Sequence, residues 1–231
     1  MLIGGYQKLT LIDYPGKIAT TVFTVGCSFR CPFCHNPELV TEFQPLDYGQ
    51  QEKEFFAHLK KRIGKLEGVC ITGGEPTIQP DIIDFIKKIK KLGFLVKLDS
   101  NGSRPDVLKK VFDQKLVDFV AMDIKNSPRK YSQTAGTKVD LARVRLSVEL
   151  IRRSGVDYEF RTTVVPGLHT AKDFEKIAAW LKGAKRYYLQ AYREMRILDP
   201  KLRQKTKGKK IDLVAIKKKI EPYFGLMGIR E

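Results

Sequence analysis

The stretch Cys27-Ser-Phe-Arg-Cys31-Pro-Phe-Cys34 places three cysteines within eight residues, with the spacing C-x3-C-x2-C. Three thiolates on one short loop can hold three corners of a cubane iron–sulfur cluster and leave the fourth iron open. An open iron lets a cluster bind and reduce a substrate rather than only pass electrons. The alternative is a structural zinc site with His35 as fourth ligand. Zinc sites usually add a distant second pair of ligands, and the sequence has no such pair.

The fourth cysteine, Cys70, lies in Gly68–Thr72, an apolar run that is typical of a buried strand. We expect Cys70 to be a small buried apolar residue rather than a ligand. A structural disulfide is not expected, because the other cysteines are clustered and the sequence shows no secretion signal. It also shows no apolar run long enough for a membrane helix. Because thiolate ligation needs a reducing compartment, we expect a cytoplasmic protein.

Length and composition predict one globular domain over residues 1–231, with a lead-in over residues 1–17 and a last helix over about residues 211–223. The formal net charge is +17, and basic residues concentrate in Lys87–Lys91 and again in Lys201–Lys219. Such a surface favours an acidic partner, and the alternative is a solvated lysine-rich surface, which we favour for most of the charge. Nucleic acid is not expected as a partner, because no aromatic residues are interleaved with the basic ones.

From residue 18 onward, apolar strand-like runs alternate with amphipathic helix-like stretches. Strands are predicted at Ile18–Val25, Val69–Thr72, Phe94–Leu98, Val117–Met122, Val156–Val165 and Arg186–Gln190. Helices are predicted at Gln50–Leu66, Asp81–Leu92, Pro105–Gln114, Asp140–Ser154, Ala171–Leu181 and Ile211–Tyr223. Six βα repeats with short loops indicate an α/β fold with a parallel sheet and helices outside it. Six repeats are fewer than the eight of a closed barrel, so we predict a partial, open TIM-like barrel.

Polar and glycine-rich residues recur directly after the predicted strands, where parallel α/β folds place their active sites. Gly73 and Gly74 allow a close backbone approach to a ligand, and Glu75 with the strand-end carbonyls suits a protonated amine. The alternative is a plain strand-end turn. Asp99 could accept from a ribose hydroxyl or a cation, or could begin an Asx turn.

Three further charged residues belong to the candidate site. Lys125 follows Asp123 by two residues and could hold a carboxylate, or the two could form a surface ion pair. Arg161 lies in an otherwise apolar strand, where an unpaired charge would be costly, so we expect it to face the site. His169 follows a Pro-Gly turn, and we expect it to shape a loop rather than to catalyse.

These motifs together resemble the glycyl-radical-enzyme activases of the radical S-adenosylmethionine (SAM) superfamily, and most of all the branch that activates anaerobic ribonucleoside-triphosphate reductase. The resemblance covers nearly the whole chain. It rests on Gly5–Gly16, Cys27–Val40, Ile71–Thr77, Leu98–Gly102, Ala121–Lys125, Arg161–Gly167 and Leu189–Tyr192.

The resemblance implies a role for each matching position. Cys27, Cys31 and Cys34 would bind a [4Fe–4S] cluster. Gly73, Gly74 and Glu75 would line the methionyl amine of SAM. Asp99, Asp123 and Lys125 match polar positions that, in pyruvate formate-lyase activating enzymes, surround SAM and an associated monovalent cation. Those relatives carry a histidine after the sixth strand, where this sequence has Tyr192.

The implied reaction is reductive cleavage of SAM, followed by abstraction of a glycine hydrogen on an anaerobic ribonucleotide reductase. The implied electron donor is a flavodoxin or a ferredoxin, because the sequence has no flavin-binding signature and a single cluster motif. The alternatives are activation of another glycyl radical enzyme of the pyruvate formate-lyase type, a radical SAM reaction on a small molecule, and a non-catalytic metal-binding module.

Overall fold

The computed structural model describes residues 1–41, 48–193 and 196–230. Within them, one sheet runs in the order of the sequence, from β1 at one edge to β8 at the other, and the two edge strands do not pair. Strand β1 is antiparallel to β2, and each later strand is parallel to the one before it. The strands are β1 (Ile3–Thr10), β2 (Ala19–Thr24), β3 (Gly68–Gly73), β4 (Leu95–Ser100), β5 (Phe119–Asp123), β6 (Asp157–Val164), β7 (Arg186–Ala191) and β8 (Leu226–Arg230).

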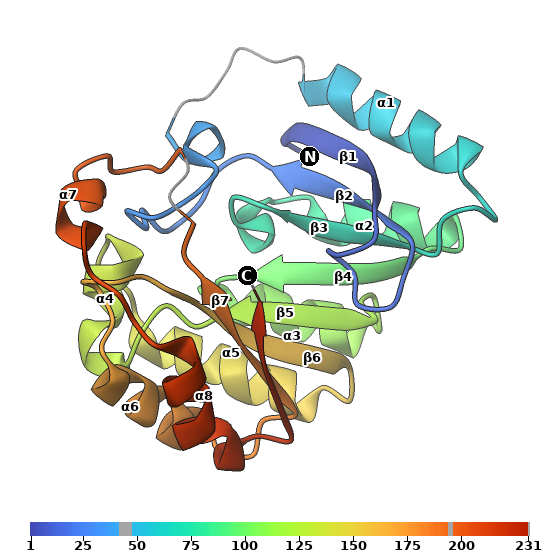
Figure 1. The fold of residues 1–231 in the computed structure, drawn as a ribbon. Helices are drawn as coiled ribbons and strands as arrows, with labels where there is room; N and C mark the ends of the chain where they lie inside the picture. Colours follow the sequence, from blue (N-terminus) through green and yellow to red (C-terminus); the bar gives the residue numbers. More distant parts are fainter. Residues whose placement is uncertain (42–47, 194–195, 231) are drawn as a thin grey trace.

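The helices lie on the outer side of this curved sheet, and the two edges stay apart (Figure 1). They are α1 (Tyr48–Lys61), α2 (Ile82–Lys91), α3 (Pro105–Asp113), α4 (Tyr131–Ala135), α5 (Leu141–Arg153), α6 (Ala171–Leu181), α7 (Leu202–Thr206) and α8 (Leu213–Ile220). The predicted α/β fold with an open barrel is confirmed. No helix in the described part of the chain is long and apolar enough to cross a membrane.

All six predicted strands are present as β2 to β7, and the six predicted helices correspond to α1, α2, α3, α5, α6 and α8. The last predicted helix is shorter than expected, since α8 ends at Ile220 and a 3-10 turn follows it. The sequence did not predict β1, which lies in the expected lead-in, nor β8, α4 and α7. The helices α4 and α7 each contain five residues, which is too short for a clear amphipathic period.

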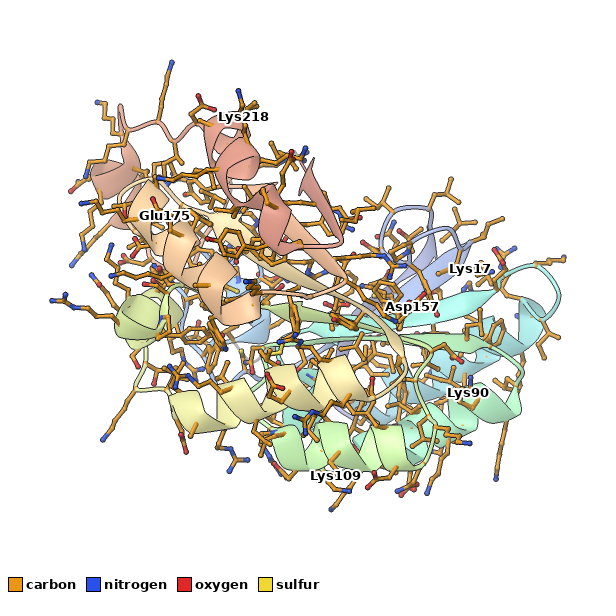
Figure 2. All side chains as sticks on the ribbon, turned by 90° about the horizontal axis from the view of Figure 1, so that it is seen from below. Lys17, Lys90, Lys109, Asp157, Glu175 and Lys218 are labelled. Atoms are coloured by element: carbon orange, nitrogen blue, oxygen red, sulfur yellow. The ribbon has the colours of Figure 1, made fainter. Side chains whose placement is uncertain are left out.

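The main apolar core fills the space between the sheet and the helices. Alternate residues of each strand point to this core, as Val69 and Ile71 of β3 do, and they meet buried helix residues such as Phe85 and Ile89 of α2. The lysines of the helices extend from the opposite faces, and Figure 2 shows Lys90, Lys109 and Lys218 at the periphery. The predicted amphipathic pattern therefore accounts for the outer layer of the fold.

The inner face of the sheet differs between its two ends. Near the amino ends of the parallel strands, Tyr14, Ala19, Phe119 and Ala121 form a second, small apolar cluster. Toward the carboxyl ends the inward side chains become charged, beginning with Lys97, which is only 1% exposed. The apolar cluster thus lies at the amino ends of the strands, and the polar motifs lie at the carboxyl ends.

Candidate functional site

One cavity of about 220 Å³ lies at the carboxyl ends of the parallel strands. It brings together every site residue that the sequence predicted, from the loops and strand ends of five different βα units. These residues are Cys27, Cys31, Cys34, Gly73, Gly74, Glu75, Asp99, Asp123, Lys125 and Arg161. The convergence predicted from strand-end positions is therefore present in the folded chain.

The cysteine loop, residues 27–34, follows β2 and is fixed by contacts with a distant part of the chain. The backbone N–H of Arg30 donates to the carbonyl of Ala135 at 2.8 Å. The next residue, Gly136, ends α4 with φ +66°, and a Cβ there would lie 1.9 Å from the Arg30 carbonyl oxygen. The helix α4 thus supports the loop through a close backbone contact that requires glycine.

Of the three thiols of the loop, that of Cys31 is buried and those of Cys27 and Cys34 are half-buried. Burial raises the pKa of Cys27 to about 12 and that of Cys31 to about 11, and it also raises the pKa of Cys34. The positive charge of Lys125 opposes this effect at all three. Because the effect of burial exceeds that of Lys125, the thiols keep their protons at neutral pH, so a metal group that binds here must displace protons as it binds.

The donor set fits a three-thiolate iron–sulfur cluster. All three thiols line one cavity, and the N–H of Phe29 points to the Cys27 sulfur with an N–S distance of 3.4 Å. Backbone N–H groups directed at sulfur are among the features that tune the potential of such clusters. The cavity also leaves space beside the thiols, which a cluster with one open iron needs.

The zinc alternative finds no support in the geometry. The His35 ring instead contacts the Arg193 backbone, with an Nε2–O distance of 3.1 Å, and stacks on Tyr192. Across residues 1–41, 48–193 and 196–230, no three His, Cys, Asp or Glu side chains are arranged to hold a single metal ion.

Gly73 and Gly74, at the end of β3, are needed first for packing within the chain. Gly73 has φ +106°, and a Cβ there would lie 2.5 Å from the Thr24 amide nitrogen. A Cβ on Gly74 would lie 2.0 Å from the Gly26 carbonyl oxygen. The residues that the sequence associated with close approach to a ligand therefore also bring the β3 loop against the start of the cysteine loop.

Glu75 is 1% exposed, and its carboxylate accepts hydrogen bonds from the chain itself. The donors are the N–H and hydroxyl of Thr77, the Ser100 hydroxyl at 2.9 Å and the Asn101 N–H at 2.6 Å. Burial raises the pKa of Glu75, and these hydrogen bonds oppose that effect. Glu75 thus joins the loops after β3 and β4, a structural role that the sequence did not predict.

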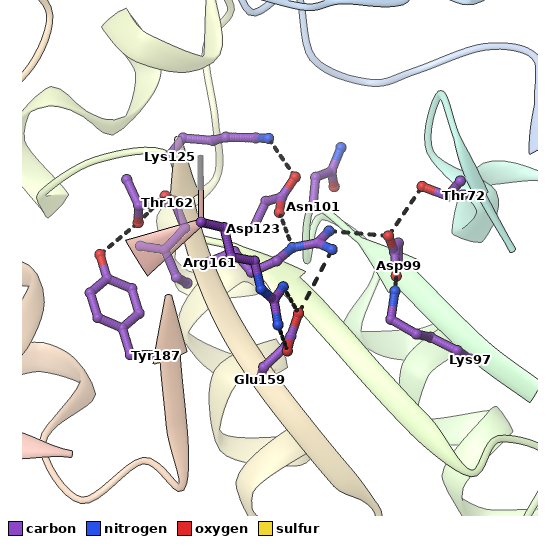
Figure 3. A network of polar contacts seen from close by, with 12 residues as sticks. Thr72, Lys97, Asp99, Asn101, Asp123, Lys125, Glu159, Arg161, Thr162 and Tyr187 are labelled. Atoms are coloured by element: carbon purple, nitrogen blue, oxygen red, sulfur yellow. Dashed lines mark hydrogen bonds and ion pairs between the residues drawn. The ribbon is translucent and has the colours of Figure 1, made fainter. Parts of the chain in front are cut away.

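Asp99 is held by two cations on the inner face of the sheet (Figure 3). Lys97 donates to one carboxylate oxygen, and Arg161 and Thr72 donate to the other at 3.1 and 3.2 Å. Burial alone would lower the pKa of Lys97, but the Asp99 carboxylate raises it above its ordinary value. Asp99 belongs to β4 rather than to an Asx turn, and its expected cationic partners lie within the chain.

Asp123 bridges Lys125 and Arg161, each at 3.0 Å (Figure 3). Burial alone would raise the pKa of Asp123, but the two cations hold it well below its usual range. The Lys125 side chain is 14% exposed, so this ion pair lies within the cavity rather than on the surface. Arg161 lines this cavity, as expected from its place in the strand, and its part in cofactor binding stays a prediction.

Two other sequence expectations concern residues outside the catalytic set. Cys70 is fully buried as expected, although it lies 3.5 Å from the Lys97 ammonium rather than in purely apolar surroundings. His169 shapes a loop as expected: its Nδ1 accepts from the Val165 N–H at 3.1 Å, and its Nε2 is 2.8 Å from the Lys125 carbonyl oxygen.

Several residues of the site were missed by sequence reasoning. Asn101 lines the cavity and donates to the Ser28 hydroxyl of the cysteine loop at 3.1 Å. Lys97 and Glu159 are buried charges of β4 and β6, two residues before Asp99 and Arg161. The alternation of charged and apolar residues in these strands is a signal that could have identified them, because side chains two apart share one face of a strand.

Comparison with known proteins gives a consistent picture. Residues 21–181 match the family model of the radical SAM superfamily. A Methanocaldococcus jannaschii protein named as a glycyl-radical enzyme activating enzyme is 30% identical over 234 residues, which cover 99% of this chain and 95% of that protein. A pyruvate formate-lyase-activating enzyme of Streptococcus mutans is 29% identical over 216 residues, covering 84% of this chain and 78% of the enzyme.

The fold is also found in a solved structure of low sequence identity. Streptococcus suis SuiB bound to S-adenosylmethionine superposes with a TM-score of 0.65 at 16% identity. The match covers 89% of this chain and 48% of the SuiB chain, so this chain spans about half the length of that protein.

Proposed function

This chain belongs to the radical SAM superfamily, and from that premise we propose that it is a glycyl-radical-enzyme activase whose partner is an anaerobic ribonucleotide reductase. The observation that carries the proposal is the single cavity that all the predicted cluster and SAM residues line, at the open end of a sheet whose edges do not pair. The relative from Methanocaldococcus jannaschii, which matches over almost all of this chain, supports an activase.

In this proposal Cys27, Cys31 and Cys34 hold a [4Fe–4S] cluster. When bound, the reduced cluster and SAM supply a one-electron cleavage of the sulfonium that starts hydrogen abstraction from a glycine of the partner. The chain supplies position and exclusion of water. Phe29 and Phe33 line the cavity beside the thiols and are buried, so they limit the access of water to the reacting groups.

The charged residues of the cavity would hold SAM. The Lys125 ammonium would bind the carboxylate of SAM, and Asp123 keeps that ammonium in place. The backbone at Gly73 and Gly74 would receive the amine. Asp99 compensates the charges of Lys97 and Arg161, so that Arg161 can face the cavity without leaving an unpaired charge.

The open edge of the sheet suits a macromolecular substrate. A glycine on a loop of another protein must reach the carboxyl ends of the strands, and no pairing between β1 and β8 closes the sheet there. A pyruvate formate-lyase is the second candidate partner, favoured by the relative from Streptococcus mutans. The pyruvate formate-lyase activating enzymes that this chain resembles have a histidine at the position where this chain has Tyr192, after β7. This difference favours the reductase as the partner enzyme.

The test is electron paramagnetic resonance of a mixture of reconstituted protein, SAM, dithionite and an anaerobic ribonucleotide reductase. We expect a glycyl radical signal on the reductase, and none on a pyruvate formate-lyase treated in the same way. A signal on the formate-lyase alone would reassign the partner. Release of 5′-deoxyadenosine without a radical on either enzyme would instead support a small-molecule substrate.

A further inference from the structure

The segment Lys201–Lys219, here called the basic segment, is not used by the proposed function. It connects β7 to β8 and includes α7 and most of α8. It contains nine lysines and arginines and a single acidic residue, Asp212. The side chains of Lys205, Lys207, Lys209 and Lys210 are exposed, and within the described residues they form no ion pair. Positive charge is therefore concentrated in this segment, and these four lysines carry it without an ion-pair partner, whereas Lys217 and Lys219 pair with Glu221 and Glu175.

The chain just before the basic segment is bonded directly to the cysteine loop. The N–H of Leu198 donates to the carbonyl of Cys34 at 3.1 Å, and the N–H of Asp199 donates to the carbonyl of Pro32 at 3.0 Å. Figure 1 shows α7 beside the loop that follows β2. A protein bound to the basic segment would thus lie next to the backbone that carries two of the three cysteines.

A groove of about 620 Å³ runs along the basic segment between α6 and α8. Ile216 and Ile220 form its apolar floor, and Lys209 and Lys210 lie on its rim. His169 contributes to its wall and also contacts the carbonyl of Lys125, a residue that lines the cavity, so one contact joins a wall residue of the groove to a residue of the cavity. An apolar floor with a basic rim is complementary to a protein surface that has an apolar patch surrounded by carboxylates.

We propose that the basic segment is the docking surface for an acidic one-electron carrier protein of the flavodoxin or ferredoxin class, which reduces the cluster. This inference rests on the proposed function. In the step, the carrier loses one electron and the cluster gains it, with no bond formed and no proton transferred. The carrier approaches the carbonyl side of the cysteine loop, while the cavity on the thiol side remains free for SAM and the partner glycine.

The test compares two variants with the same loss of charge. One carries K205Q, K207Q, K209Q and K210Q in the basic segment. The matched control carries K60Q, K61Q, K87Q and K91Q at exposed positions of α1 and α2, on another side of the molecule. Both are reconstituted, and the Kd for an oxidised acidic flavodoxin is measured by titration at low salt. Stopped-flow absorbance then follows reduction of the cluster by the reduced flavodoxin and, separately, by dithionite.

We expect the basic-segment variant to bind flavodoxin about tenfold more weakly and to be reduced by it about tenfold more slowly, because complementary charge raises association rates by factors of this size or more. The control should change by less than about twofold, and added salt should remove the difference. Dithionite should reduce all three proteins at similar rates.

Equal effects in the two variants, or none in either, would overturn the docking surface. The docking surface would also be overturned if flavodoxin reduces the basic-segment variant at an unchanged rate, while that variant forms no glycyl radical with dithionite as reductant. That result would assign the basic segment to binding of the glycyl radical enzyme. A selective loss of flavodoxin binding, in a protein that activates no glycyl radical enzyme, would support the docking surface and overturn the proposed function.

Discussion

Arg230 and Glu159 form two parallel hydrogen bonds, from Nη1 to Oε1 at 2.6 Å and from Nη2 to Oε2 at 2.7 Å. The Glu159 side chain is 1% exposed, and the Arg230 guanidinium lies 3.7 Å from the centre of the Tyr188 ring. Glu159 is also 3.9 Å from Arg161, which faces the cavity. This pair therefore connects the edge strand β8 to the charged interior of the sheet.

Replacing Arg230 by methionine should destabilise the protein, because it leaves the buried Glu159 carboxylate without its bidentate partner. We expect a loss of about 2 kcal/mol in the free energy of unfolding, less than for a fully buried pair since Arg230 is partly exposed. Urea unfolding measures the change. The double variant Glu159→Gln with Arg230→Met should lose less than the sum of the two single variants. An unchanged urea midpoint in Arg230→Met would show that the pair contributes nothing.

Replacing Cys27, Cys31 or Cys34 by alanine should abolish SAM cleavage, and the wild-type protein should bind about four irons and four sulfides after anaerobic reconstitution. Cys70→Ala is the control, because Cys70 does not line the cavity. It should keep the iron and lose only some stability through a small cavity. Iron analysis measures the cluster content of each variant, and release of 5′-deoxyadenosine measures SAM cleavage. Loss of the cluster in Cys70→Ala, with retention in one of the other variants, would contradict the ligand assignment.

Lys125→Met should weaken SAM binding by about a hundredfold without removing iron, because the ammonium is a charge partner and not a ligand of the cluster. Lys130→Met is the matched control, since Lys130 pairs with Asp173 at 2.6 Å and does not line the cavity. Equilibrium dialysis with labelled SAM on the reconstituted variants provides the measurement. If both variants bind SAM as the wild type does, Lys125 does not contact SAM.

His169 should make the protein less stable at mildly acidic pH. Burial lowers the pKa of His169 from its ordinary value of 6.5, so the unfolded chain binds a proton that the folded chain does not. The contribution of neutral His169 to the free energy of unfolding is therefore fully present above pH 6.5. It falls as the pH decreases through the lowered pKa of the folded state. His169→Gln does not titrate there, so the wild type should lose stability relative to this variant between about pH 7.5 and pH 5. If the free energies of unfolding of the wild type and of His169→Gln change with pH in the same way, His169 is not the cause of the loss of stability.

The outer layer of the fold could be predicted from the sequence because helix and strand periods mark it directly. Each of the strands β2 to β7 contains buried apolar residues, and the helices between them show clear 3.6-residue patterns. The edge strands were missed for physical reasons. Strand β1 has Gly4 and Gly5 directly after Ile3 and continues with the exposed residues Gln7 and Lys8, and β8 has five residues, none of them fully buried.

The candidate site was predicted as a set of positions, but its internal contacts were not. Strand-end motifs identified Asp99 and Arg161, yet the ion pair between them spans 62 residues of sequence and depends on the strand order. Glu75 shows the same limit: Thr77 is a local donor to its carboxylate, but Ser100 and Asn101 belong to the end of β4 and the loop after it, which only the folded chain brings close. Pairings of this kind follow from topology and register, which local patterns do not encode.

The charged interior of the sheet has a consequence for how the protein responds to heat. Lys97 and Glu159 are almost fully buried, and they pair with Asp99 and Arg161, whose side chains are each 13% exposed. The hydration of charged groups becomes less favourable as temperature rises, so the cost of burying them falls, while apolar burial gains little more. The charged interior therefore contributes least to the free energy of unfolding at low temperature and most at high temperature. A purely apolar interior of the same size would gain little further stabilisation at high temperature.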